Sequence, residues 1–483
     1  MQQSLLSFVL KGNASLSPRC GPSCQEAPTV HVSQSRMAAS YSVPLSALSA
    51  TELQRHKRQL TMVSQDNSYN NQAPASFDAF QVDDARLYVP RFYGYAQWGA
   101  PDDWRVTEGQ EMELSFAGTL NPVQEEATAA ALVQLNSSPH GALLVLPCGY
   151  GKTVCALYIA HKLQRRTLVL VHKGFLVQQW HERAKTFLPD ASLGIIQQNK
   201  ADGSADIVVG MVQSISKRDY AEDLLANFGT VIIDEAHHMS APVFSRALHC
   251  LPAKHILGLS ATPERRDGLT CLLYHSMGPI CYRIERKPEH TMVSCMLYEG
   301  GKRKEIKYRD GRVSMPLMLN ALVTDPSRNE LIATHLCKYL AQGRHVIVLT
   351  DRIVQLHALQ SLLVEKGVDA REIGYYIGST SVADRERSSH LPCILSTYSM
   401  AKEGLDIPRL DTLVMATPKG DIIQASGRIQ RKHPSKRVPL IVDVVDTFSV
   451  FEALRWKRWQ FYRHEKFACQ TFDITKSDAS WFV

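Results

Sequence analysis

The sequence lacks any apolar run approaching the ~20 residues that a helix needs to cross a bilayer, so we expect no membrane partner. Its N-terminal apolar segment is brief and follows no basic residue, which argues against a secretory signal. The eleven cysteines follow no repeating framework, as expected of reduced thiols in an intracellular protein of the cytoplasm or nucleus that is not secreted. Cys20 and Cys24 have no second pair nearby, so we expect no zinc site there.

Length and charge set broad limits on what is present. A chain of 483 residues exceeds what one hydrophobic core organises, so two or three domains are expected. The hydrophobic content of 45% and the charged content of 21% are those of an ordinary globular protein. The formal net charge of +7 permits an anionic partner, but a solvated basic surface explains so small an excess equally well.

The pattern of residues changes several times along the chain. Residues 1–76 are rich in Ser, Gln, Asn and Ala and are predicted to be mostly disordered. Residues 77–117 contain aromatic residues among prolines and glycines, which favours a small accessory module that packs on the next domain over one that stacks bases. Beyond them, short β-branched runs alternate with helical stretches in two series, and each series predicts a parallel sheet with helices on both faces. The remaining predicted divisions are a first α/β domain at 118–285, a linker at 286–325, a second α/β domain at 326–448 and a C-terminal helical extension at 449–483.

The stretch LLVLPCGYGKT, residues 143–153, predicts a buried strand, a glycine-containing loop and a helix. Backbone N–H groups of such a loop, together with the helix N-terminus, bind phosphate oxygens. Lys152 would reach the outer phosphates, and the Thr153 hydroxyl would bind the magnesium ion that accompanies a nucleoside triphosphate. Leu146 stands where the strict phosphate-loop pattern has glycine, and strand–turn–helix junctions with glycine are common. The predicted phosphate-binding residues are Cys148, Gly149, Tyr150, Gly151, Lys152 and Thr153.

The second motif is VIIDEAHH, residues 231–238, at the end of an apolar run. Ligand-binding groups of open α/β sheets occupy the carboxyl ends of strands, so Asp234 would hold the magnesium ion. Glu235 would polarise the attacking water, and His237 would lie close enough to the phosphates to report their state. The alternative is a pair of solvated acids or a helix cap.

The third motif is QASGRIQR, residues 424–431. On a helix, Arg428 and Arg431 would share one face and converge on a single anion. The planar guanidinium fork suits charge neutralisation on a transferring phosphoryl group, although a solvated basic stripe is the alternative. A further helix is predicted over residues 451–467, with its two tryptophans away from the face of Phe451 and Arg458; packing is favoured there over a nucleic-acid contact.

Taken together, these motifs resemble the superfamily 2 helicases and translocases of the DEAH type, over residues 120–446. The resemblance implies two tandem RecA-like α/β domains with ATP bound in the cleft between them. It also implies roles for residues in the remaining motifs. Gln124 would read the adenine edge, Gln424 would act with the two arginines, and Gly404 and Asp406 would lie at the nucleotide. The residues implied to couple hydrolysis to motion are Ser260, Ala261 and Thr262, and those implied to contact nucleic acid are His172, Lys173, Gln213, Thr350, Arg352 and Thr397.

Within the superfamily, the ATPERRDG segment at residues 261–268 looks most like the xeroderma pigmentosum B type helicases and the helicases of phages and large DNA viruses, including the poxvirus transcript-release helicase. This likeness implies ATP and Mg²⁺ as cofactors and DNA, more than RNA, as the nucleic-acid partner. It also implies a role in viral or cellular transcription or in DNA repair, with a polymerase or repair factors as partners, and a location in the host cell or virion if the protein is viral. The alternatives are an RNA helicase and an ATP-gated clamp or remodeller that separates no strands.

Overall fold

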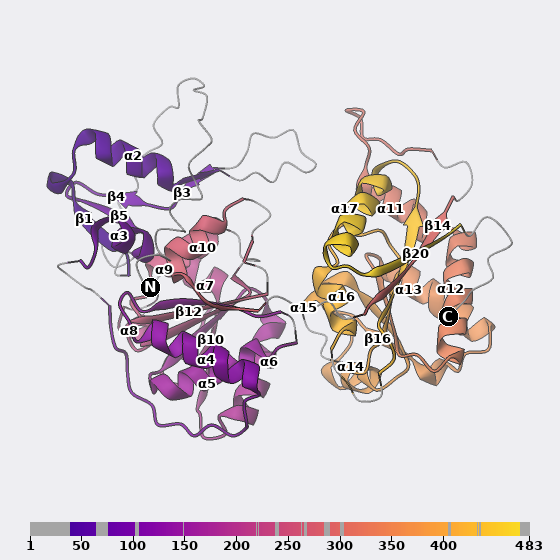
Figure 1. The fold of residues 1–483 in the computed structure, drawn as a ribbon, viewed down its shortest axis with the longest axis horizontal. Helices are drawn as coiled ribbons and strands as arrows, with labels where there is room; N and C mark the ends of the chain where they lie inside the picture. Colours follow the sequence, from indigo (N-terminus) through magenta and orange to yellow (C-terminus); the bar gives the residue numbers. More distant parts are fainter. Residues whose placement is uncertain are drawn as a thin grey trace. The chain divides into compact units, whose positions relative to one another are not determined.

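The computed structural model describes residues 39–63, 76–101, 106–147, 149–218, 220, 222–236, 241–261, 263–264, 268–284, 290–299, 304–403, 407–431, 433 and 436–473. Two large sheets organise most of this part of the chain (Figure 1). No helix within the described ranges is long and apolar enough to cross a membrane.

A small α+β module precedes the first large sheet. Its helix α2 begins with a capping box in which Ser49 and Glu52 each bond the other's backbone N–H, which satisfies two otherwise unpaired donors. Three antiparallel strands are ordered β1-β5-β4, and β2 pairs with β3. The elements of the module are β1 (Tyr41–Pro44), η2 (Leu45–Ala47), α2 (Ala50–Leu60), β2 (Thr61–Val63), β3 (Ser76–Asp78), β4 (Gln81–Val82), β5 (Arg86–Val89) and α3 (Arg91–Trp98).

The predicted disorder of residues 1–76 is wrong for residues 41–63, which form four of these elements. Residues 1–38 and 64–75 of that prediction lie outside the described part. The composition misled because few apolar residues suffice here: Leu60 and Met62 are buried in a core shared with the first large sheet. A polar segment orders when a neighbouring domain supplies the rest of its core.

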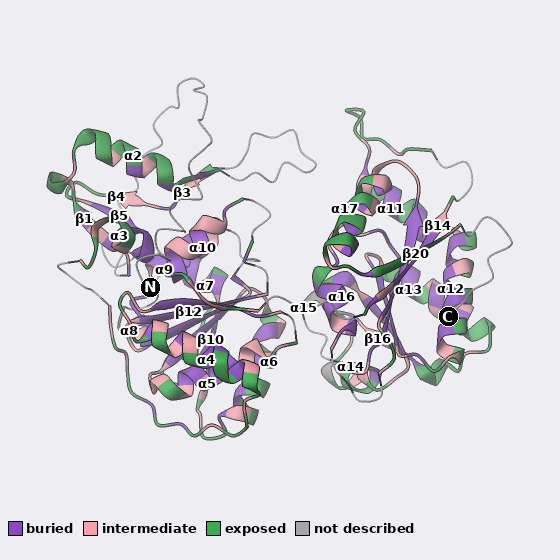
Figure 2. Cartoon of the chain, in the orientation of Figure 1, coloured by how far each residue is buried: buried purple, intermediate pink, exposed green. Residues whose placement is uncertain are grey.

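The first large sheet has eight strands in the order β13-β6-β12-β11-β7-β10-β8-β9, parallel except for β9. Each central strand is buried on both faces, so alternate side chains feed two different cores (Figure 2). Helices α4, α5 and α6 cover one face, and α7, α9 and α10 cover the other. The strands are β6 (Gly141–Val145), β7 (Thr167–Val171), β8 (Leu193–Gln197), β9 (Lys200–Ala201), β10 (Ile207–Met211), β11 (Thr230–Asp234), β12 (His255–Ser260) and β13 (Ile280–Arg283). The helices are α4 (Pro122–Leu135), α5 (Lys152–Leu163), α6 (Gly174–Phe187), α7 (Val212–Lys217), α8 (Glu222–Ala226), α9 (Ala241–His249) and α10 (Thr270–Met277).

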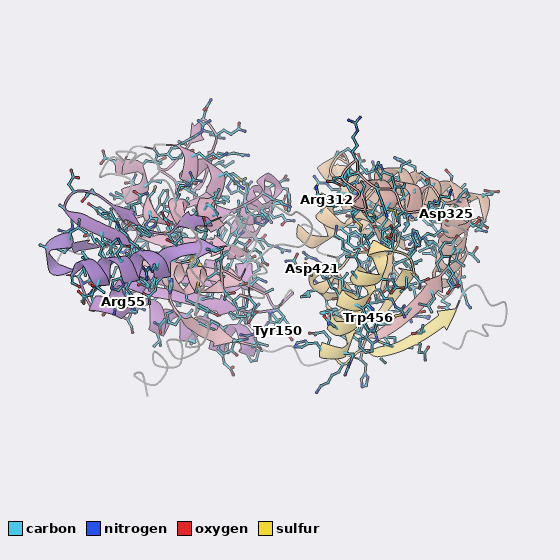
Figure 3. The ribbon with its side chains drawn as sticks, turned by 90° about the horizontal axis from the view of Figure 1, so that it is seen from above. Arg55, Tyr150, Arg312, Asp325, Asp421 and Trp456 are labelled. Atoms are coloured by element: carbon cyan, nitrogen blue, oxygen red, sulfur yellow. The ribbon has the colours of Figure 1, made fainter. Side chains whose placement is uncertain are left out.

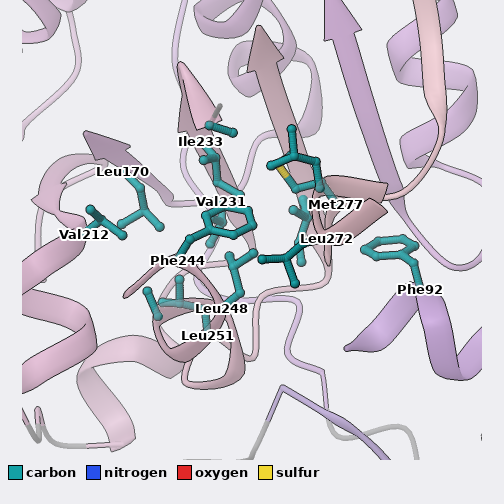
Figure 4. Close-up of a cluster of buried hydrophobic side chains, with 14 of the residues drawn as sticks. Phe92, Leu170, Val212, Val231, Ile233, Phe244, Leu248, Leu251, Leu272 and Met277 are labelled. Atoms are coloured by element: carbon teal, nitrogen blue, oxygen red, sulfur yellow. The ribbon is translucent and has the colours of Figure 1, made fainter. Parts of the chain in front are cut away.

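The module packs directly onto this domain. Buried Arg91 donates to the backbone oxygens of Lys254 at 3.0 Å and Ala253 at 2.8 Å. The Phe92 ring joins the cluster of Leu272 and Met277 on α10 (Figure 4). The module and the first domain therefore share one hydrophobic core.

The second large sheet has seven parallel strands in the order β16-β17-β15-β18-β19-β14-β20. Its two faces are covered by α12 and α13 on one side and by α15, α16 and α17 on the other. The strands are β14 (Met292–Tyr298), β15 (Val346–Thr350), β16 (Ile373–Tyr376), β17 (Cys393–Thr397), β18 (Thr412–Met415), β19 (Leu440–Asp446) and β20 (Ala468–Asp473). The helical elements are α11 (Met315–Val323), α12 (Pro326–Ala341), α13 (Ile353–Glu365), η4 (Ala370–Glu372), α14 (Val382–Ser389), α15 (Tyr398–Glu403), α16 (Ile423–Ile429) and α17 (Val450–His464).

Both ends of the predicted second domain differ from the structure. The segment 286–325, predicted as a linker, contains β14, which pairs along its whole length with β19. The segment 449–483, predicted as a helical extension, contains β20 after α17, and β20 pairs with β14. The sequence pattern missed β14 because mixed charges surround its seven residues.

Candidate functional site

The phosphate-loop and DEAH motifs meet at one edge of the first sheet. Strands β6, β12 and β11 are neighbours, with Val145 opposite Ser260 and Leu259 opposite Asp234. Because parallel strands end at the same edge, the loops that follow these three strands lie side by side. The structure thus brings together motifs that are far apart in the sequence.

The loop after β6 has positive φ angles at its two glycines. Gly149 has φ +90° and Gly151 has φ +81°, a region that side chains strain to adopt. A Cβ at Gly151 would lie 2.3 Å from Nε2 of Gln124, so an added side chain would have to displace the Gln124 amide as well as strain the backbone at the start of α5. Lys152 and Thr153 follow as the first two residues of α5, both half-buried. The loop and the helix start therefore form the geometry expected of a phosphate cradle.

Lys152 and Glu235 form an ion pair at this edge. The Lys152 Nζ lies 3.2 Å from Glu235 Oε1 and also donates to the Leu146 carbonyl oxygen at 3.3 Å. The side chains are 10% and 19% exposed, so the pair is largely shielded from solvent. The ammonium that would bind outer phosphates is thus held by the residue predicted to activate water.

Asp234 is buried and receives a hydrogen bond that the sequence did not reveal. The indole Nε1 of Trp180, on α6, donates to Asp234 Oδ2 at 2.9 Å. Burial, and secondly the charge of Glu235, raise the pKa of Asp234 to about 6. The Trp180 bond opposes that rise because it stabilises the carboxylate. The sequence motifs assign Trp180 no contact with Asp234.

The backbone at Glu235 is strained. Its φ of +48° is left-handed, which is uncommon for a residue with a side chain. Strain of this kind costs roughly 1–3 kcal/mol and persists where the surrounding structure enforces it. The strand β11 ends at Asp234, so this turn directs the Glu235 side chain to Lys152.

Gln124 has local partners in the structure. Its Oε1 accepts from the Asn121 backbone N–H at 3.0 Å, forming the capping box of α4. Its Nε2 donates to the Tyr150 carbonyl oxygen at 3.3 Å, so it links α4 to the phosphate loop. The adenine role stays a prediction.

The coupling and nucleic-acid residues of the first domain lie along the same edge. Ser260 is buried at the end of β12, its carbonyl oxygen accepts from Leu146 N–H at 3.0 Å, and half-buried Ala261 follows it. His172 and Lys173 follow β7, and Gln213 is the second residue of α7, which follows the adjacent β10. The Gln213 amide donates to the His172 carbonyl oxygen at 2.9 Å. The two loops predicted to contact nucleic acid are therefore joined directly.

In the second domain, the helix that carries the third motif is shorter than predicted. Helix α16 ends at Ile429, so Arg431 lies beyond it and does not share a helical face with Arg428. The prediction of a helix-borne arginine pair is wrong in this respect. Gln424 is buried on α16, and the half-buried Arg428 donates from Nε to the Ala401 carbonyl oxygen at 3.0 Å.

The predicted nucleic-acid residues of the second domain lie at the ends of two paired strands. Thr350 and Thr397 are opposite one another at the ends of β15 and β17. The Thr350 side chain is fully buried and donates to Gln355 Oε1 at 2.6 Å, so a direct nucleic-acid contact by its hydroxyl is wrong for this structure. Thr350 instead accepts from the Arg352 N–H at 3.2 Å and shapes the turn. Arg352 is half-buried and bonds Asn320, and the Thr397 hydroxyl bonds that of Ser399.

Five predicted site residues lie outside the described part of the chain, and their roles stay predictions. They are Cys148, His237, Thr262, Gly404 and Asp406.

The residues at this edge fit a magnesium-bound nucleoside triphosphate. The glycines adopt positive φ values that leave backbone N–H groups free of a Cβ, Lys152 supplies a cation, and Thr153 and Asp234 supply the hard oxygen ligands that Mg²⁺ prefers. This donor set, placed at the carboxyl ends of a parallel sheet and followed by a second parallel sheet, defines a phosphate-loop ATPase with two RecA-like domains.

Comparison with known proteins gives the family. Residues 117–265 match the model of the Type III restriction enzyme, res subunit. The provisionally named ATP-dependent RNA helicase L396 of Acanthamoeba polyphaga mimivirus is 32% identical over 422 residues, which cover 84% of this chain and 81% of the relative. The provisionally named helicase D10 of Escherichia phage T5 is 29% identical, over 67% of this chain and 69% of the relative. The chain belongs to the superfamily 2 helicases, an ATP-dependent class.

A solved structure agrees in fold. A fragment of an HsdR subunit of a type I restriction enzyme from Vibrio vulnificus YJ016 superposes with a TM-score of 0.52 and 19% identity, over 70% of this chain and 66% of that chain. At this identity the likeness concerns the fold alone.

Proposed function

We propose that the protein is a DNA helicase or translocase whose movement is driven by ATP hydrolysis. The observation that supports this most is the single edge of the first sheet, which holds the Lys152–Glu235 pair, Asp234 and the joined loops of His172 and Gln213. A change in contacts to the outer phosphate at this edge has a direct path to the nucleic-acid loops, because both follow adjacent strands.

The chain's own residues would divide the chemistry as follows. Lys152 would bind the outer phosphates, and Thr153 and Asp234 would hold magnesium, which neutralises charge on the transferring phosphoryl group when bound. Glu235 would accept the proton of the attacking water, and Arg428 and Arg431, with Gln424, would stabilise charge in the transition state. A shared ATP site between the two domains is part of this proposal.

DNA is favoured over RNA because the matching family model is that of a restriction enzyme subunit. RNA is the second candidate, since the mimivirus protein and a relative from African swine fever virus, 27% identical over 71% of this chain and 72% of its own length, both carry the name ATP-dependent RNA helicase. An intracellular place of action is proposed from these viral relatives. Action in transcription or repair beside a polymerase or repair factors stays a prediction.

The test is ATP hydrolysis by the full chain with no nucleic acid, single-stranded DNA, duplex DNA or RNA. We expect stimulation by DNA at least equal to that by RNA, weakening steeply with salt because backbone phosphates dominate the binding. Lys152→Ala is the negative control and should abolish turnover with every polymer. Stimulation by RNA alone would select the RNA helicase, and stimulation without strand separation or movement would select the clamp.

A further inference from the structure

Helix α17 is fixed to the second domain by one face only. Its buried residues are Phe451, Leu454, Arg458 and Tyr462. Arg458 Nε donates to Asp443 Oδ2 at 2.8 Å, and the Tyr462 hydroxyl donates to the same oxygen at 3.0 Å. Arg458 also donates to the Lys419 carbonyl oxygen at 3.0 Å. These contacts to β19 and to the loop before α16 hold the helix rigidly, so the direction of its other face is determined.

That other face presents aromatic rings to solvent. Trp456 is 57% exposed and Trp459 is 40% exposed, and their ring centroids lie 5.5 Å apart, edge to face. The Arg463 guanidinium lies over the Trp459 ring, 4.8 Å from its centroid, and Arg463 is itself exposed. Figure 3 labels Trp456 on the yellow ribbon of α17, and Figure 2 colours much of that helix as exposed. We name Trp456, Trp459 and Arg463 the tryptophan face.

The tryptophan face is not among the buried residues of α17. The helix buries one apolar and ion-paired side, while Trp456 and Trp459 remain 57% and 40% exposed, where hydration of two indoles is unfavourable. Indole faces stack on nucleobases of any sequence, and adjacent cations attract the phosphates between them. The exposed charge of Arg463 fits an anionic chain.

We propose that the tryptophan face is a nucleic-acid contact on which bases of a single strand stack. It is separate from the strand-end loops of Thr397 and Arg352 and rests on the proposed function, because only a protein that binds nucleic acid would use it. Stacking of this kind is independent of base sequence. It would give the second domain a nucleic-acid contact that is separate from the proposed ATP site.

The test is binding of fluorescein-labelled oligo(dT) and oligo(U) to the full chain, followed by anisotropy, together with the quenching of tryptophan fluorescence. We expect the double variant W456A/W459A to bind at least about tenfold more weakly, as loss of base–aromatic stacking predicts. W456F/W459F should keep near wild-type affinity but lose much of the quenching. Tyr308→Ala removes an aromatic side chain that is 49% exposed elsewhere in this domain and should change neither.

Basal ATP hydrolysis without nucleic acid should be the same in all these variants. Affinity of W456A/W459A within twofold of wild type would overturn the proposal, as would a matching fall in basal hydrolysis, which would mean that the tryptophans only support the fold. Failure of the wild-type protein to bind either polymer is a different result, because it would overturn the proposed function itself.

Discussion

Lys152 and Glu235 satisfy each other's charge where the outer phosphates of a nucleotide would bind. The Lys152 Nζ and Glu235 Oε1 atoms lie 3.2 Å apart and both side chains are largely shielded from solvent. Each charge therefore has an opposite charge beside it, which offsets the cost of burial. A phosphate entering the cradle would take the place of the Glu235 carboxylate beside Lys152. Glu235 would then be released toward water at the moment when a base is required.

Glu235→Gln tests whether Glu235 is the base that activates water. The amide keeps the volume of the side chain but cannot accept the proton of water, so hydrolysis should fall by about 10²–10⁴-fold. ATP binding should be retained, because the Lys152 ammonium is still present. Turnover measured by phosphate release, beside nucleotide affinity measured by equilibrium binding, separates the two effects. Hydrolysis within a fewfold of wild type would mean that another residue is the base.

Trp180→Phe tests the hydrogen bond to Asp234. Phenylalanine keeps most of the packing but leaves a buried carboxylate oxygen without its 2.9 Å donor. Because such supporting bonds are typically worth ~10–100-fold in metal affinity or activity, we expect turnover to fall in that range and to recover partly at high Mg²⁺. Val177→Ala, a buried change on the same helix, controls for lost packing. An unchanged magnesium dependence would leave Trp180 a core residue only.

At the scale of elements, α16 and its neighbours decide what the third motif can do. The helix ends before Arg431, and the Arg428 Nε is bonded to the end of α15 at Ala401. Arg428 is thus held by backbone in a fixed place, while Arg431 is positioned by the turn that follows. Only the structure separates these two roles.

Arg428→Ala should lower turnover by ~10³-fold or more with a modest loss of ATP affinity, because such an arginine acts mainly in the transition state. Arg428→Lys is the matched variant, since it keeps the charge but loses the planar fork, and it should remain strongly impaired. The melting temperatures of both variants show whether loss of the hydrogen bond to α15 has destabilised the domain and so lowered turnover indirectly. Loss of affinity without loss of turnover would assign Arg428 to ground-state binding.

At the scale of the whole molecule, the N-terminal module is part of the first domain's core. Phe92 of α3 lies so close to Gly141, the first residue of β6, that a Cβ there would be 1.9 Å from its Cζ atom. The strand that leads to the phosphate loop therefore begins under the module.

Gly141→Ala should destabilise the protein by roughly 1–3 kcal/mol, because the Phe92 ring and its neighbours must shift. Gly378→Ala, which has nothing within 4 Å of the added Cβ, is the control. Urea unfolding measures both variants. Equal stability would show that the module tolerates displacement from the first domain.

Acid should weaken this shared core. Burial lowers the pKa of His249, His255 and His275 to about 4 each, so they are neutral in the folded chain. The unfolded chain binds these protons near pH 6.5. The free energy of unfolding should therefore fall as pH decreases from about 6.5 toward 4. Urea unfolding between pH 7 and 5 measures the slope, and His275→Phe should reduce it; an identical slope would assign the acid sensitivity to other groups.

Local patterns in the sequence were enough for much of this molecule. Alternation of apolar strands and amphipathic helices predicted the two parallel sheets, and the residues after the strands predicted the phosphate cradle and the acidic pair, because side-chain period and glycine backbone freedom are local properties. Local patterns could not reveal that Trp180 bonds Asp234, that β14 and β20 complete the second sheet, or that residues 41–63 fold on the first domain. Each depends on partners distant in sequence, whose contact is decided by strand order and packing of the whole chain.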